Sequence, residues 1–294
     1  MKILLLGANG QVGYELRRAL APLGQVVCAT RDGRLHDGVA CEVADFDAPG
    51  SLPALVERID PRVVVNAAAY TAVDRAETEH AAAFRANAEA PAALAHACAR
   101  TDALLVHYST DYVFDGTATR PYREDDPVAP LGVYGESKLA GEQEIGSSNA
   151  RHVILRTAWV YADRGRNFML TMLRLAGERD ELRVVSDQTG TPTPASLIAD
   201  RTAAMLAIPF EESGIWHLTA QGGTTWYGFA EAVVERAYAL GRIARRPNMV
   251  PIATADYPTP AQRPAYSRLD CSKFERDSGG PLPDWKGALE GVLR

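Results

Sequence analysis

The segment KILLLGANGQVGYELRRAL, residues 2–20, joins an apolar run to a glycine loop and then to a helical pattern. Lys2–Leu6 has the composition and length of a buried strand, and the apolar residues of Gln11–Leu20 recur at helical spacing. A strand, a glycine loop and a helix in this order form the first unit of a doubly wound α/β sheet. The segment therefore predicts an α/β protein with a glycine loop at the end of a parallel strand.

The glycines of this loop have the spacing GxxGxxG. Gly7 permits a tight turn, Gly10 lets backbone N–H groups approach a pyrophosphate, and Gly13 lets the helix pack close to the sheet. We therefore expect a dinucleotide site lined by Gly7, Gly10, Gln11, Val12 and Gly13. A glycine-rich turn without a ligand is the other interpretation, and the strand-to-helix setting argues against it.

Further short apolar runs alternate with helical stretches in the first half of the chain. The runs are Val26–Ala29, Arg62–Asn66, Ala103–Ser109 and His152–Thr157, and the helical stretches include Leu52–Ile59 and Ala81–Arg100. This alternation predicts a Rossmann-like, doubly wound parallel sheet. The second half is less regular, and we interpret it as a smaller, interleaved substrate domain. The expected dinucleotide-binding domain is 1–157 plus roughly 180–220, and the expected substrate-binding domain is 158–179 and roughly 221–294.

Composition and charge exclude several classes of protein. Apolar residues make up 47% of the 294 residues and charged residues 23%, which is typical of a folded globular protein. The formal net charge of -6 argues against a nucleic-acid partner, although a local arginine cluster can still bind a small phosphorylated ligand. The four cysteines form no CxxC pair, and the short apolar start predicts neither a signal peptide nor a membrane span. We therefore expect a cytoplasmic protein with reduced thiols and no membrane partner.

The residues after the second predicted strand bear on the choice of nicotinamide cofactor. Dinucleotide sites often carry an acid at this place to bind the ribose hydroxyls. Thr30 and Arg31 stand here instead, and a guanidinium suits a 2′-phosphate. We therefore expect a preference for NADPH, with NADH as the alternative because Asp32 is the next residue.

A tyrosine and a lysine four residues apart begin another helical stretch. Tyr134 and Lys138 in YGESK project from one face of that helix. A free tyrosine has a pKa of about 10, and a nearby cation lowers it. The pattern predicts that Lys138 lowers the pKa of Tyr134, so that Tyr134 acts as a general acid near neutral pH. A solvated pair on a surface helix is the other interpretation.

The segment STDYVF, residues 109–114, follows an apolar run, and ligands of open α/β sheets bind outside the carboxyl ends of strands. Thr110 is therefore expected to hydrogen-bond the carbonyl oxygen that Tyr134 protonates. The order of glycine loop, strand-end threonine and YxxxK resembles the extended short-chain dehydrogenases/reductases. It predicts a nicotinamide-dependent reductase with Thr110, Tyr134 and Lys138 as catalytic residues.

Five longer segments narrow this resemblance. They are VVNAAAYTAVDRAE (64–77), VHYSTDYVFDG (106–116), VYGESKLAGE (133–142), LRTAWVYADRGRNF (155–168) and YPTPAQRPAYSRLD (257–270). They closely resemble the dTDP-4-dehydrorhamnose reductase family, and the resemblance covers nearly the whole chain. It implies hydride reduction of the 4-keto group of dTDP-4-dehydro-L-rhamnose, the last step of dTDP-L-rhamnose synthesis for cell-surface polysaccharide.

The resemblance also implies roles for individual residues. Tyr134 would be the general acid, Lys138 would hold the nicotinamide ribose, and Thr110 would polarise the carbonyl. The residues implied for the cofactor also include Asp45, Phe46, Ala69, Tyr70, Thr71 and Tyr108. Those implied for the nucleotide sugar are Thr71, Val73, Thr110, Asp111, Tyr134, Trp159, Asn167 and Arg263. A plain core role for Trp159 and a surface charge at Arg263 are the other interpretations.

A structural metal is doubtful. Some members of the family are described as dimers bridged by magnesium through glutamates, and Glu15 matches the first of these. Ser196 stands where another glutamate would align, and only Glu290 lies near the last residue, Arg294. We therefore expect no metal in the site, leave a homodimer open, and interpret Glu15 as an exposed acid near a helix start.

Three other functions share parts of the pattern. A nucleotide-sugar dehydratase needs acids directly after the strand-end threonine, whereas Thr110 is followed by Asp111 and then Tyr112. A 4-epimerase uses the same tyrosine and lysine with tightly held NAD, so purified protein without cofactor would argue against it. A regulatory subunit that binds NADP would need none of the three catalytic residues.

Overall fold

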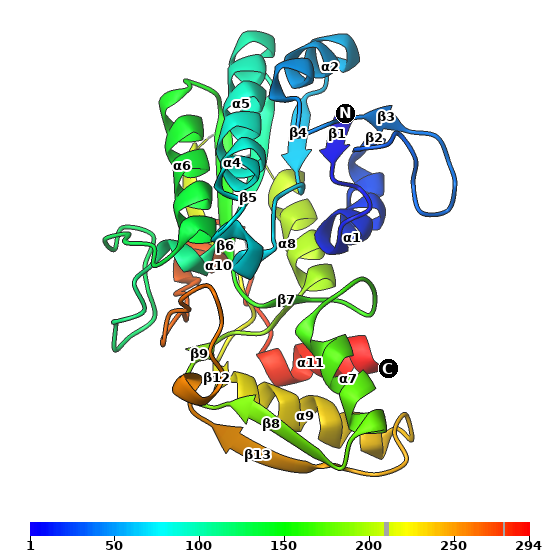
Figure 1. Ribbon diagram of the computed structural model, residues 1–294. Helices are drawn as coiled ribbons and strands as arrows, with labels where there is room; N and C mark the ends of the chain where they lie inside the picture. The colour runs from blue at the N-terminus through cyan, green and yellow to red at the C-terminus, as the bar shows by residue number, and fades with distance from the viewer. Residues whose placement is uncertain (209–211, 279) are drawn as a thin grey trace.

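A seven-stranded parallel sheet takes six strands from residues 1–157 and one, β11, from later in the chain (Figure 1). The computed structural model describes residues 1–208, 212–278 and 280–294. The strand order is β11-β6-β5-β4-β1-β2-β3, and each neighbouring pair is parallel. The strands are β1 Lys2–Leu6, β2 Gln25–Thr30, β3 Glu42–Val43, β4 Val63–Asn66, β5 Leu104–Thr110, β6 His152–Thr157 and β11 Gly214–His217. The predicted doubly wound fold is confirmed, and the order reverses beside β1, where such sheets bind ligands.

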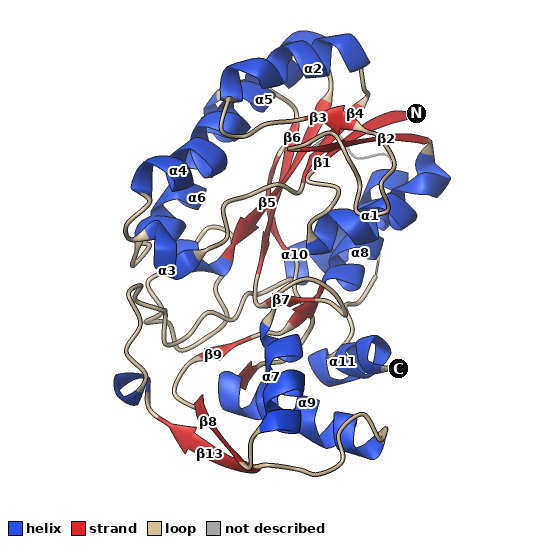
Figure 2. Cartoon of the chain, turned by 45° about the vertical axis from the view of Figure 1, so that its right-hand side comes forward, coloured by secondary structure: helices blue, strands red, loops and turns tan. Residues whose placement is uncertain are grey.

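Side chains along each central strand alternate between the two faces of the sheet. In β1, Ile3 and Leu5 join the core on one face, and Leu4 and Leu6 join the core on the other. The helices are α1 Gln11–Leu20 and α8 Ala195–Ala207 on the first face, and α2 Leu52–Ile59, α5 Ala90–Thr101 and α6 Val133–Ser147 on the second (Figure 2). Because both faces are covered, these strands are apolar throughout, which explains their continuous apolar runs.

The helical stretch predicted over Ala81–Arg100 contains a π-helical turn. α4 is His80–Phe84, the π-helical turn is Arg85–Glu89, and α5 follows directly. Pro91, in the first turn of α5, has no N–H and cannot continue a regular hydrogen-bond ladder across the junction. Such turns are frequent at functional sites, and this one carries the buried Asn87.

The second half builds a separate apolar core around Phe229. Its helices are α7 Phe168–Glu178, α9 Trp226–Ala239 and α11 Trp285–Leu293, and its strands β8 Glu181–Val185 and β13 Asn248–Ile252 pair in parallel. Two short pairs lie between the two cores (Figure 2), namely β7 Val160–Tyr161 with β10 Thr193–Pro194, and β9 Thr189–Gly190 with β12 Thr224–Thr225. The remaining α-helices are α3 Val73–Ala76 and α10 Ser272–Ser278.

The chain passes between the two cores several times. β11 joins the main sheet from the second half, and Phe274 of α10 packs into the core between the sheet and α8. Leu182 and Val184 of β8 belong to the second core, although they fall in the range 180–220 that was predicted for the first domain. The domain bounds stay a prediction, and this packing favours moving β8 to the second domain and α10 to the first.

Among the residues that the structure describes, none of the helices combines the length and the apolar character needed to cross a bilayer.

Candidate active site

A cavity of about 860 Å³ opens at the carboxyl ends of the central strands, and both halves of the chain line it. This volume suits a small-molecule ligand. The predicted residues that line it are Gly7, Gly10, Gln11, Val12, Arg31, Phe46, Ala69, Tyr70, Thr71, Val73, Tyr108, Thr110, Asp111, Tyr134, Lys138 and Trp159. Four other predicted residues, Gly13, Asp45, Asn167 and Arg263, lie outside this lining.

The glycine loop forms one wall of the cavity. Gly7 has a φ of +75°, and a Cβ there would lie 2.7 Å from the backbone nitrogen of Ala68. A Cβ at Gly13 would collide with the carbonyl oxygen of Gly7, so this glycine allows the close helix packing that the sequence predicts. Gly10 precedes α1, and no described side chain caps that helix. The first N–H groups of α1 are therefore available to an anion.

The segments after β2 and β3 line another part of the cavity, where Phe46 is buried. Arg31 is largely exposed, and its Nη2 lies 3.8 Å from Oδ2 of Asp47. An exposed pair at this distance contributes little, so the guanidinium can exchange it for a phosphate. Asp32 accepts a hydrogen bond from Oγ1 of Thr30 at 2.9 Å, and Asp45 accepts one from the backbone nitrogen of Asp47 at 2.9 Å.

Asn87, which the sequence analysis missed, fixes the loop after β4. Its Oδ1 accepts a hydrogen bond from the backbone nitrogen of Tyr70 at 2.9 Å, and its Nδ2 donates to the Tyr70 carbonyl at 3.0 Å. The same Nδ2 donates to Oγ of Ser137 at 3.0 Å, between the two predicted catalytic residues of α6. A single polar residue in a helical stretch gives no sequence signal of such a role.

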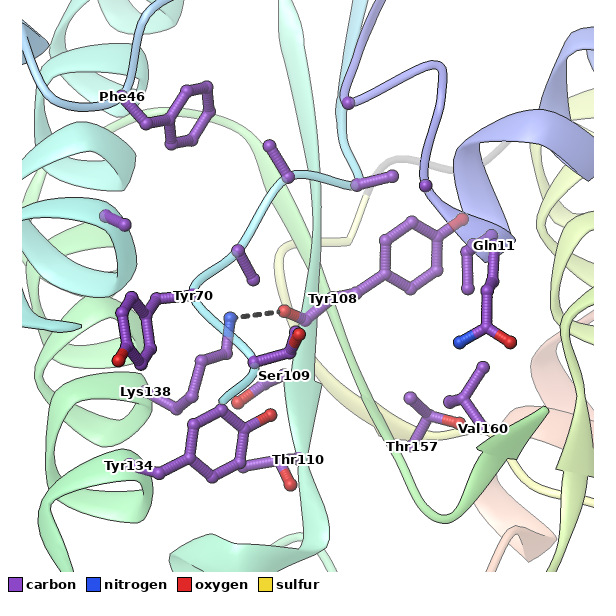
Figure 3. Close-up of a pocket in the computed structure, with 18 of the residues that line it drawn as sticks. Gln11, Phe46, Tyr70, Tyr108, Ser109, Thr110, Tyr134, Lys138, Thr157 and Val160 are labelled. Carbon is purple, nitrogen blue, oxygen red and sulfur yellow. Dashed lines mark hydrogen bonds between the residues drawn. The ribbon is translucent and has the colours of Figure 1, made fainter. Parts of the chain in front are cut away.

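The three predicted catalytic residues lie together (Figure 3). Tyr134 and Lys138 come from α6, and Thr110 ends β5. The Thr110 hydroxyl lies beside the Tyr134 phenol, and Nζ of Lys138 donates to the carbonyl of Tyr108 at 2.7 Å. The i and i+4 spacing therefore brings the phenol and the amine to one place, as the helical periodicity predicts.

Glu77 holds the start of α6, the helix that carries Tyr134 and Lys138. Its Oε1 accepts a hydrogen bond from the backbone nitrogen of Val133 at 3.0 Å. A Cβ at Gly132 would lie 2.6 Å from the same oxygen, so the carboxylate can approach only because this residue is glycine. A carboxylate at a helix N-terminus is also favoured by the helix dipole.

Burial determines the protonation of Tyr134 and Lys138, the predicted catalytic pair. It raises the pKa of Tyr134 to about 12, while the hydrogen bond with Thr110 acts in the opposite direction. The prediction that Lys138 lowers the pKa of Tyr134 is therefore wrong for this structure, because desolvation dominates. Burial also lowers the pKa of Lys138 to about 8, against the effect of the Glu142 carboxylate one turn along α6.

A buried histidine and asparagine lie behind Lys138. Nε2 of His107 is 3.0 Å from Nζ of Lys138, and Nδ1 of His107 is 3.0 Å from Nδ2 of Asn66. Oδ1 of Asn66 accepts a hydrogen bond from the backbone nitrogen of Ala68 at 3.1 Å, which orients the amide. Burial holds the pKa of His107 well below its ordinary value, so the ring is neutral. Sequence analysis missed both residues, since each lies in a buried strand and belongs to no recognisable motif of its own.

Asp111 lies deep in the cavity beside Thr110. Its Oδ1 accepts a hydrogen bond from Oγ1 of Thr110 at 3.1 Å. Burial raises the pKa of Asp111 to about 7, although hydrogen bonds from Ser267 and Thr110 lower it. The ring of Tyr112 meets that of Tyr134 edge to face, with ring centroids 5.8 Å apart. An aromatic ring, and no second acid, therefore follows Asp111 at the reacting end of the cavity.

Some of the predicted substrate residues line the cavity, and others, such as Asn167, lie outside its lining. Trp159 lines the cavity, where it stacks on Trp226, a residue that the sequence analysis did not select. Asn167 caps α7 through the backbone nitrogen of Leu170 at 3.0 Å. Its Nδ2 donates to Oε1 of Gln11 at 2.7 Å and so links α7 to the glycine loop.

Arg263 is half-buried and paired. Its Nη2 lies 2.8 Å from Oδ2 of Asp74, and its Nη1 donates to the Ala261 carbonyl at 3.1 Å. The guanidinium is thus engaged with α3 and its own loop. Its assignment to the nucleotide stays a prediction.

The interpretation of Glu15 as an exposed acid is wrong: its side chain is only 14% exposed, and Oε1 lies 3.5 Å from Nη2 of Arg164. The same guanidinium stacks 3.6 Å from the ring centroid of Tyr14. Within the described ranges 1–208, 212–278 and 280–294, no three acidic, histidine or cysteine side chains are grouped so as to hold a metal ion.

The family model described as RmlD substrate binding domain matches residues 1–294. The chain belongs to this family. Its sequence is 49% identical to the dTDP-4-dehydrorhamnose reductase of Burkholderia thailandensis, over 98% of this chain and 97% of that protein.

Two solved structures of the same kind resemble the whole chain. A dTDP-4-dehydrorhamnose reductase from Clostridium acetobutylicum matches with a TM-score of 0.89 and 36% identity, over 100% of this chain and 98% of that one. The enzyme from Bacillus anthracis, solved in complex with NADP, matches with a TM-score of 0.88 and 31% identity, over 99% of this chain and 98% of that one. Fold and full-length sequence therefore agree with the family resemblance predicted from the motifs.

Proposed function

We propose that this chain reduces the 4-keto group of dTDP-4-dehydro-L-rhamnose to give dTDP-L-rhamnose, with NADPH as the hydride donor. The proposal rests on one observation: the hydroxyl groups of Tyr134 and Thr110 lie side by side in a cavity that the glycine loop also lines. The full-length similarity to dTDP-4-dehydrorhamnose reductases supports the choice of substrate.

The cavity fits a nicotinamide dinucleotide. The uncapped N-terminus of α1 suits the pyrophosphate, with Gln11 and Val12 beside it. Arg31 suits the 2′-phosphate of NADP, and Phe46 suits the adenine. Tyr108 and Lys138 would border the nicotinamide ribose. The nicotinamide, when bound, supplies the hydride that reduces the ketone carbon.

The residues of the chain supply the proton and orient the carbonyl. With a pKa of about 12, Tyr134 carries its proton at neutral pH, and its phenol can donate that proton to O4 of the sugar. Thr110 presents a second hydroxyl at the same place, where it stabilises the negative charge that develops on O4. Lys138 is mostly cationic at pH 7, and its charge would hold the hydroxyl groups of the nicotinamide ribose.

We also propose that the two parts of the chain bind different ligands. The sheet domain would hold the cofactor, and Trp159 and the second core would hold the nucleotide sugar. The four free cysteines fit a reducing compartment, so we place the enzyme in the cytoplasm. The family resemblance also suggests a homodimer, which sedimentation equilibrium would test.

The test is to incubate the purified protein with NADPH and dTDP-4-dehydro-L-rhamnose. We expect loss of NADPH absorbance and formation of dTDP-L-rhamnose. Tyr134→Phe should lower kcat about 10²- to 10⁴-fold, because the proton donor is lost, while NADPH binding is kept. NADPH binding by the wild type without turnover would refute the reductase and favour a regulatory subunit.

The dehydratase and the 4-epimerase have less support. Tyr112 occupies the place where a dehydratase needs a second acid, and its ring packs on Tyr134. An epimerase should copurify with NAD, so a protein purified without cofactor would argue against that reaction.

A further inference from the structure

Two tryptophans on the substrate side of the cavity stack face to face. The ring centroids of Trp159 and Trp226 lie 3.5 Å apart, and the ring planes are inclined by only 6°. Aromatic pairs prefer offset or edge-to-face arrangements, with centroids about 4.5–7 Å apart, over a face-to-face sandwich. The surrounding residues must therefore hold this pair together.

Trp159 is held in an unusual backbone conformation. Its φ is +45°, in the left-handed region that a bulky residue rarely adopts. Its carbonyl accepts a hydrogen bond from the backbone nitrogen of Thr193 at 3.2 Å, which joins it to the β7–β10 pair. A Cβ at Gly190 would collide with the Trp159 indole, so the ring occupies space that a glycine leaves free. Strained residues that the structure over-determines in this way are frequent at ligand sites.

Trp226 is fixed by other elements of the second half. Thr224 pairs with Gly190 in the β9–β12 ladder, which brings Trp226, two residues later, to the same place. Its Nε1 donates to Oε1 of the buried Gln188 at 3.2 Å. The ring of Phe168 lies 4.6 Å away between centroids. These contacts fix the indole ring of Trp226 in position, and the indole ring of Trp159 stacks on it.

We propose that Trp226 is a positioning residue for the sugar: it holds the Trp159 indole in its left-handed conformation and so sets the wall against which a 6-deoxyhexose lies. The methyl group and ring C–H groups of such a sugar are apolar, and a flat indole is a complementary surface for them. Without the indole of Trp226, Trp159 can relax toward an extended backbone conformation, and its ring leaves the wall. This inference rests on the proposed function for the identity of the sugar, and the indole pair itself does not depend on it.

Circular dichroism tests the pair without substrate. Two indoles in contact couple and give a paired positive and negative band in the far ultraviolet. We expect this couplet in the wild type and its loss in Trp226→Phe and in Trp159→Phe. Trp285→Phe is the matched control, because Trp285 lies in the second core outside the lining of the cavity, and it should keep the couplet. A wild type without the couplet, or Trp226→Phe with it, would overturn the proposal.

Steady-state kinetics test the positioning role. Trp226→Leu should raise KM for the nucleotide sugar about tenfold, equivalent to ~1.4 kcal/mol, with kcat changed less than about twofold and KM for NADPH unchanged. Trp226→Phe, which keeps a planar ring, should raise KM less and serves if the leucine variant fails to fold. In a Trp159→Ala background, Trp226→Leu should add nothing, because it acts through Trp159.

Two kinetic outcomes would overturn the inference. An unchanged KM for the nucleotide sugar in both Trp226 variants would mean that the indole of Trp226 has no effect on sugar binding. Additive effects in the double variant would mean that Trp226 acts independently of Trp159. A wild type that binds NADPH but does not turn over the keto sugar would refute the proposed function instead, and the couplet would still decide whether the pair exists.

Discussion

Burial decides the charge state of the ionisable side chains in the cavity. Tyr134 is shifted to a pKa of about 12 and Lys138 to about 8, so at neutral pH the phenol is protonated and the amine is mostly cationic. This combination suits reduction, in which the tyrosine must give a proton away. Oxidation would need the phenolate, which the same burial disfavours.

Lys138 should produce an alkaline limb in the pH profile. Because its folded pKa is about 8, its charge is present below that pH and is lost above it. We expect kcat/KM at saturating NADPH to fall as pH rises above about 8. Lys138→Arg keeps the positive charge to much higher pH, so the alkaline decrease in kcat/KM of this variant should move to higher pH even if its activity is lower. An identical limb in both proteins would exclude Lys138 as its source.

Asp111 should make stability depend on pH. Its folded pKa is about 7, above an unfolded value of about 4, so between these values the folded state holds a proton that the unfolded chain has released. Stability from this group therefore falls as pH rises across that window. As the pH rises from 5 to 8, the free energy of unfolding of Asp111→Asn should increase by up to about 2–3 kcal/mol relative to that of the wild type, as measured by urea unfolding. Asp200→Asn, an exposed carboxylate on α8, is the control and should show no such change.

At the level of elements, close approaches of backbone to backbone position the site. α1 packs against the glycine loop at Gly13, and α6 packs against the π-helical turn, where a Cβ at Gly141 would collide with the Asn87 carbonyl. This π-helical turn places Asn87 between the loop at Tyr70 and α6. The elements are thus locked together at contacts that only glycine permits.

Gly13→Ala tests this packing. The added Cβ would meet the Gly7 carbonyl, so we expect a loss of stability of at least about 1 kcal/mol and at least a tenfold loss of NADPH affinity. Gly146→Ala, also in a helix but with no heavy atom near the new Cβ, should instead gain about 0.5–1 kcal/mol. Thermal unfolding and fluorescence titration would measure both. Normal NADPH affinity in Gly13→Ala would contradict the role of the close approach.

For the whole molecule, net charge opposes the proposed ligands. The formal charge is -6, whereas NADPH and a nucleotide sugar are anions, so attraction must come from local groups such as Arg31 and the N-terminus of α1. Arg31→Ala should therefore lower NADPH affinity about five- to tenfold at low salt and leave NADH affinity nearly unchanged.

Arg18→Ala is the control for this prediction. It removes the same charge from the molecule, but Arg18 lies on α1 in an exposed pair with Asp200, away from the cavity lining. Equal losses in both variants would show that overall charge, and not the position of Arg31, determines the affinity.

Local patterns in the sequence determined the sheet and the glycine loop, and they predicted the catalytic residues. Strand and helix periodicity act over a few residues, so they predict β1 and α1 and put Tyr134 and Lys138 on one face. The motifs then indicated the family, which the full-length comparisons confirm. Only the tertiary structure decided the protonation of Tyr134, the ion pair of Arg263 and the stacking of Trp226 on Trp159. These depend on burial and on contacts between segments far apart in the chain, which no local pattern encodes.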